Sequence, residues 1–203
     1  MSPYSGLGFF LTLAIVLVPA VMLGLRGKNL RVCGLIVTAV FLPLIFDTPG
    51  KLLTLVLFWA WQLVVMFGYL RVRRRTEKRY VLWLALGLSL FPLIFTKLSI
   101  FIAPLCVFSM LGISYVSFRA AQILVEIYDG HIETLNVLDV SYFLLFFPSI
   151  LSGPLDRFQR FSADLSKTRS GAEYEMLLKE GLWRIATGAI YNFVFGNLIW
   201  QYW

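Results

Sequence analysis

The chain has 203 residues, of which 59% are hydrophobic and 14% are charged, and its formal net charge is +7. Its apolar runs are long and nearly uncharged, so the composition excludes a water-soluble domain and predicts an all-α, polytopic integral membrane protein. Cys33 and Cys106 lie inside apolar runs without CxxC spacing or partner histidines, so we expect neither a disulfide framework nor a metal site.

The first region, residues 1–95, is expected to form hairpins of apolar helix with short loops. Its predicted membrane segments are Leu7–Leu25, Val32–Phe46, Leu52–Leu70 and Tyr80–Phe95. A spanning helix needs about 20 apolar residues, so the second and fourth segments must tilt, thin the bilayer or borrow flanking residues. No basic stretch precedes the first segment, and its apolar core is too long for a signal peptide, so we expect a retained helix.

Basic residues gather in alternate loops of this region. Arg26, Lys28 and Arg31 follow the first segment, and the third is followed by Arg71, Arg73, Arg74, Arg75, Lys78 and Arg79. The positive-inside rule predicts that both loops are cytoplasmic, which puts the N-terminus outside the cell membrane. Arg73, Arg74 and Arg75 are candidate contacts for membrane lipid or an acidic cytoplasmic partner, with a topology signal alone as the alternative. Nucleic acid is not expected to bind a loop this close to the membrane.

The second region, residues 96–203, is expected to form an irregular core of tilted, short and broken helices. Its candidate membrane segments are Leu98–Val116, Leu138–Leu151 and Ile185–Trp203. Prolines and glycines interrupt it at positions 104, 112, 130, 148, 153 and 154. Broken helices are tolerated at membrane depth only where they are buried in protein or line a cavity, so a functional site is expected here.

The segment Arg157–Arg184 is polar and amphipathic. Ser170 and Glu173 have the spacing of a capping box, which predicts the start of a helix that lies on the membrane surface. The segment Tyr191–Trp203 then carries no charge, and we interpret the chain as truncated within an apolar run.

A polar stripe crosses the otherwise apolar segment Gly112–Gly130. Tyr115, Arg119, Gln122, Glu126 and Asp129 are spaced by four, three, four and three residues, which places them on one helical face. In a membrane protein such a face is directed toward protein, a water-filled cavity or the interface rather than lipid. We expect Arg119 to pair with Glu126 or Asp129 in the interior.

Motifs of known catalytic chemistry are missing from the chain. It contains no HExxH, Walker or GxSxG motif and no cluster with metal-ligand spacing, and its single histidine, His131, is interpreted as a solvated or capping residue. Glu126 and Asp129 are one turn apart, but a structural ion pair is the more ordinary interpretation than acid–base catalysis. Asp156 and Arg157 either hold the loop after Pro154 or meet a charged ligand.

Two linked motifs resemble the membrane-bound O-acyltransferase superfamily. The first is GISYVSFRAAQILVEIYDG at Gly112–Gly130, with Gly112, Ser114, Tyr115, Phe118, Arg119, Tyr128 and Gly130 at the matching positions. The second is FFPSILSGPLDRF, with Phe147, Pro148, Gly153, Pro154 and Arg157 at the matching positions. Within the superfamily, the sequence of these motifs is most similar to that of the branch that transfers D-alanine to teichoic acids in Gram-positive cell walls.

The resemblance implies a fold, a reaction and a set of partners. The fold would be a ring of tilted helices with a funnel on the outer face. The donor would be a D-alanyl thioester on the phosphopantetheine arm of a D-alanyl carrier protein, the acceptor a teichoic acid, and no cofactor would be bound. The residues expected to shape the donor tunnel or the polar core are Tyr115, Arg119, Gln122, Glu126, Asp129 and Arg157.

The chain also departs from the family pattern. Family members are longer, and their catalytic histidine lies downstream of the Gly-Pro motif, so His131 does not take that role. The chain is therefore expected to be the N-terminal part of an acyltransferase, with no catalytic residue of its own and no activity alone. The alternatives are a transporter or lipid-binding scaffold without chemistry, or an O-acyltransferase acting on lipid or polysaccharide.

Overall fold

The computed structural model describes residues 7–46, 48–102, 112–150 and 156–202, and these ranges are helical without any strand. The helices are α1 (Leu7–Leu25), α2 (Arg31–Ile45), α3 (Pro49–Arg73), α4 (Arg79–Ile102), α5 (Ile113–Tyr128), α6 (Val137–Leu145), α7 (Phe158–Ser166), α8 (Gly171–Ile190) and α9 (Gly196–Tyr202). A 3₁₀ turn, η1 (Phe147–Ser149), follows α6, and a π-helical turn, η2 (Tyr191–Phe195), joins α8 to α9. The all-α prediction is confirmed.

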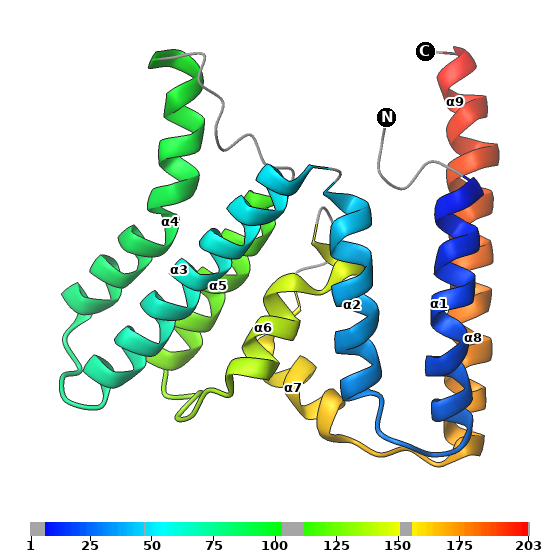
Figure 1. Cartoon of the computed structure of the whole chain (residues 1–203), viewed down its shortest axis with the longest axis horizontal. Coiled ribbons are helices and arrows are strands. Elements are labelled where there is room, and N and C mark those ends of the chain that lie inside the picture. The colour runs from blue at the N-terminus through cyan, green and yellow to red at the C-terminus, as the bar shows by residue number, and fades with distance from the viewer. Residues whose placement is uncertain (1–6, 47, 103–111, 151–155, 203) are drawn as a thin grey trace.

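The helices form two groups joined through α2 (Figure 1). α3, α4 and α5 pack together on one side, and α6 lies between them and α2. On the other side α1 lies against α8, which α9 continues. The α1–α2 and α3–α4 loops, which carry the basic residues, lie at the same end of the molecule, as the topology prediction requires (Figure 1).

The predicted membrane segments agree with the structure best in the first region. α1 has the predicted bounds, and α2, α3 and α4 cover the next three segments with shifted ends. By length and hydropathy, α3 and residues 79–98 of α4 are sufficient to cross a bilayer, whereas α2 and residues 11–25 of α1 are shorter apolar stretches. Large apolar side chains such as Val64 and Trp83, which are 69% and 70% exposed, cover the outside. Such a surface suits contact with lipid.

Two segments of the second region were predicted wrongly. Leu98–Val116 is not one span, because α4 ends at Ile102 and α5 begins after Gly112, while residues 103–111 lie outside the described ranges. Leu138–Leu151 is not a span either, because α6 has only 9 residues and gives way to the turn that Pro148 begins. Leu151 and the Gly153–Pro154 break also lie outside the described ranges. The division into regions 1–95 and 96–203 stays a prediction.

The apolar segment from Ile185 continues α8 through η2 into α9. α8 begins where the sequence predicts, since the Ser170 hydroxyl accepts a hydrogen bond from the backbone N–H of Glu173 at 3.3 Å. The Glu173 carboxylate does not complete the capping box, because it pairs with Arg169 at 3.7 Å. α8 contains no buried residue, so it forms an outer element of the structure.

Candidate functional site

The polar stripe lies on α5, the helix with the deepest packing. Gly112 and Gly130 flank it in the left-handed conformation, with φ of 92° and 77°, a geometry that glycine adopts without steric cost. Between them Ala120, Ile123 and Leu124 are fully buried. The two glycines therefore set both ends of the helix that carries the candidate site.

Arg119 joins the two motifs of the sequence. Its guanidinium donates a hydrogen bond to the backbone carbonyl of Phe143 at 2.8 Å and another to the hydroxyl of Ser149. It also lies 5.3 Å from the centre of the Phe143 ring, and the residue is only 3% exposed. Phe143 belongs to the last turn of α6, where carbonyl groups lack intrahelical partners and a cation is favourable. Arg119 thus caps α6 and ties η1 to α5.

The predicted pairing of Arg119 with Glu126 or Asp129 is wrong. Neither carboxylate forms an ion pair with Arg119 in the structure; Glu126 instead accepts a hydrogen bond from Gln122 at 3.2 Å. The carbonyl groups at the end of α6 approach α5 from another element, and helical spacing within α5 could not reveal them.

The other residues of the stripe differ in how exposed they are to solvent. Glu126 is 9% exposed, and its second carboxylate oxygen forms no hydrogen bond within the described ranges. Tyr115 and Gln122 are half-buried, while Asp129 is exposed at the end of α5. Arg119 and Glu126 therefore face the protein interior, and Asp129 is exposed where the helix emerges from the core, which the predicted direction toward protein or the interface allows.

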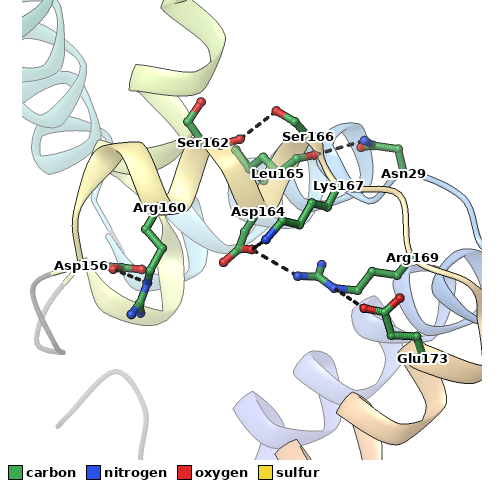
Figure 2. Close-up of polar contacts among 10 residues, drawn as sticks. All are labelled: Asn29, Asp156, Arg160, Ser162, Asp164, Leu165, Ser166, Lys167, Arg169 and Glu173. Carbon is green, nitrogen blue, oxygen red and sulfur yellow. Dashed lines mark hydrogen bonds and ion pairs between the residues drawn. The ribbon is translucent and has the colours of Figure 1, made fainter. Parts of the chain in front are cut away.

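Arg157 lies apart from this buried network. It is exposed at the start of α7, and its backbone N–H donates to the Asp156 carboxylate at 2.8 Å. Asp156 also pairs with Arg160 at 3.0 Å, as Figure 2 shows, so it organises the first turn of α7. His131 is exposed as well, and its carbonyl accepts a hydrogen bond from Gln159.

The arginines at the end of α3 and in the loop after it are of two kinds: some bind carbonyl or hydroxyl groups of other segments, and others have side chains without a partner among the described residues. Arg73 donates to the carbonyl of Tyr128 at 3.1 Å and lies over its ring, and Arg74 donates to the carbonyl of Glu133 at 2.9 Å. Arg79 donates to the Tyr128 hydroxyl at 3.1 Å. Arg75 is exposed, and its side chain has no hydrogen-bond or ion-pair partner among the described residues. Of the three predicted contact residues, Arg73 therefore holds the C-terminal end of α5, Arg74 holds the segment that follows it, and the Arg75 side chain remains available.

Two polar contacts were not predicted from the sequence. Gln62 of α3 and Ser89 of α4, both fully buried, exchange hydrogen bonds of 2.9 and 2.7 Å. Arg31 at the start of α2 pairs with Asp139 of α6 at 2.5 Å. Gln62 is the single amide side chain within the apolar run Leu52–Leu70, and this isolated polar residue was the feature from which a buried hydrogen bond could have been predicted. In the described ranges no group of three or more His, Cys, Asp or Glu side chains could hold a metal ion.

The chain is similar over almost its whole length to bacterial proteins that are named as D-alanyltransferases. It is 37% identical over 212 residues to the teichoic acid D-alanyltransferase of Bacillus subtilis, covering 100% of this chain and 53% of that protein. The proteins of the same name from Lacticaseibacillus rhamnosus and Streptococcus thermophilus are 33% and 30% identical, covering 52% and 48% of their lengths. No protein-family model matches the sequence.

The resemblance to teichoic acid D-alanyltransferases, inferred from two motifs, is therefore confirmed over the full chain. The relatives are transferases by name, and this chain spans about half the length of each.

Proposed function

We propose that the chain is part of a membrane enzyme that transfers D-alanine to hydroxyl groups of teichoic acid. The observation that carries this proposal is the similarity of the entire chain to three proteins named for that activity. The buried junction between the two motifs, built on Arg119, supports it, because fixed irregular backbone is what an interior wall of a membrane site requires.

The donor in this proposal is a D-alanyl thioester on the phosphopantetheine arm of a carrier protein. The acceptor hydroxyl oxygen attacks the thioester carbonyl, an ester bond forms and the carbon–sulfur bond breaks. The hydroxyl proton passes to a general base, and the thiol leaves with a proton. The single histidine of the chain, His131, is exposed beyond the end of α5, so we infer that the base is supplied from outside these 203 residues.

The carrier protein would meet the end of the molecule that carries the basic loops. We infer that this end is cytoplasmic and that the chain crosses the membrane several times with its N-terminus outside. Arg71 and Arg75 are exposed there, and their side chains form no hydrogen bond or ion pair within the described ranges. Exchange of both for Gln should weaken carrier binding at low salt, whereas an equal affinity would remove the loop from the docking surface.

A chimera tests the function directly. This chain replaces the matching segment of the Bacillus subtilis relative in a strain that lacks its own copy, and D-alanyl esters on teichoic acids are measured. We expect esters to be restored by the chimera and not by this chain alone. A chimera that reaches the membrane in normal amount but forms no ester would contradict the proposal. Esters formed without the carrier protein would favour a different O-acyltransferase.

A further inference from the structure

Two adjoining cavities lie between α1 and the core. The larger, of about 480 Å³, is apolar and partly open, and its lining includes Leu13, Leu17 and Ala20 of α1 together with Val37 of α2. The smaller, of about 230 Å³, lies toward the basic end and has a more polar lining than the larger one. Leu30, Tyr142 and Phe146 line both cavities, so the two cavities adjoin and together offer an amphipathic space.

Cations outnumber carboxylates in the lining of the smaller cavity. Its lining includes Lys28, Arg31, Lys167 and Arg169, against Asp164 as the single lining carboxylate. Lys167 and Arg169 share Asp164 at 3.2 and 3.3 Å, and Figure 2 shows both directed toward this carboxylate. Two further carboxylates pair with cations of this lining: Glu173 pairs with Arg169 at 3.7 Å, and Asp139 pairs with Arg31 at 2.5 Å.

Lys28 is the cation of this lining that takes part in none of these ion pairs. It is exposed, and its side chain forms no hydrogen bond or ion pair in the described part of the chain. The Asp164 pairs are themselves solvent-accessible, with the Lys167 side chain 63% exposed, and pairs of that kind contribute roughly 0–1 kcal/mol. An incoming anion can therefore draw on Lys28, Lys167 and Arg169 without breaking a strong contact.

We propose that this space binds one anionic phospholipid of the membrane leaflet at the basic end. The phosphate would lie among Lys28, Lys167 and Arg169, and an acyl chain would enter the apolar cavity beside Ala20. The volume of the apolar cavity is in the range of small-molecule binding pockets, about 300–1,000 Å³. The charge selects the headgroup, because basic groups near an anionic leaflet contribute about 1 kcal/mol each. This inference does not depend on the proposed acyltransferase function.

Native mass spectrometry tests the proposal on the whole chain released from detergent with either phosphatidylglycerol or phosphatidylcholine. We expect one phosphatidylglycerol to be retained with clear preference over phosphatidylcholine. Lys28→Gln should lower that preference about fivefold, the equivalent of one basic contact, while Lys51→Gln, an exposed lysine of α3, should leave it unchanged. Lys28 lies in a loop, so this variant keeps the fold.

A second pair of variants tests the apolar cavity. Ala20→Phe fills it and should abolish retention of the lipid, whereas Ala14→Phe adds the same bulk on the exposed side of α1 and should not. Equal retention of the two lipids by the unaltered chain would overturn the proposal. So would full retention in a folded Ala20→Phe variant, or an equal loss in the Lys28 and Lys51 variants.

Discussion

Replacement of Arg119 by Ala should be among the most destabilising single changes in the chain. The change removes two hydrogen bonds from a charged donor, each contributing about 1.5–3 kcal/mol, and leaves the Phe143 carbonyl unpaired in the interior. It also creates a cavity at a residue that is 3% exposed. Relief of the buried charge offsets part of this loss, so we expect a net cost of about 3–5 kcal/mol.

The assay is thermal unfolding of the purified chain in detergent, followed by tryptophan fluorescence. A loss of this size should lower Tm on the order of 10 °C for a chain of about 200 residues. Arg119→Met keeps the packing of the side-chain stem and removes the charge, so its loss should be smaller, about 1–3 kcal/mol.

Two results would refute the reasoning about Arg119. One is a shift in Tm of less than about 2 °C for Arg119→Ala, since each kcal/mol corresponds to roughly 2–4 °C. The other is strong coupling to Glu126. A double-mutant cycle with Glu126→Gln should give a coupling energy below about 0.5 kcal/mol if the two side chains do not interact. A larger coupling would restore the ion pair that helical spacing predicted.

Three further predictions use the same unfolding assay. Gln62→Leu should cost about 1–3 kcal/mol because it leaves the buried Ser89 hydroxyl unpaired, and adding Ser89→Ala should recover part of the loss; no recovery would mean that the two do not interact. Gly171→Ala should destabilise the contact of α8 with α1, because a Cβ there overlaps a backbone carbonyl oxygen, whereas Gly181→Ala, with open space around it, should be neutral or stabilising. Arg73→Gln should cost about 1–2 kcal/mol through its bond to the end of α5, and an unchanged Tm would assign this arginine to topology alone.

The amino-acid sequence of this chain indicates its function more directly than the packing of its helices does. The two motifs led to the acyltransferase resemblance, and the alignments extend it over the whole chain. The structure adds how the motifs are joined, through one arginine whose partners lie 24 and 30 residues away. It also changes the role of the basic loop, because Arg73 holds the end of α5 and Arg74 holds the segment after it, while Arg75 remains exposed.

Local chemistry determined the features that the sequence predicted well. The helical class and the bounds of α1 follow from apolar runs, and the ends of α5 follow from glycines that accept positive φ. The N-cap of α8 follows from Ser170 in the same way.

Only the tertiary structure decided what holds Arg119 and where the two adjoining cavities form. Each of these depends on groups far apart in the chain. A charged side chain buried in an apolar interior binds whichever carbonyl, hydroxyl or carboxylate the packing brings to it. The spacing of residues within one helix specifies the face on which the side chain lies, and the packing of the other helices specifies its partner.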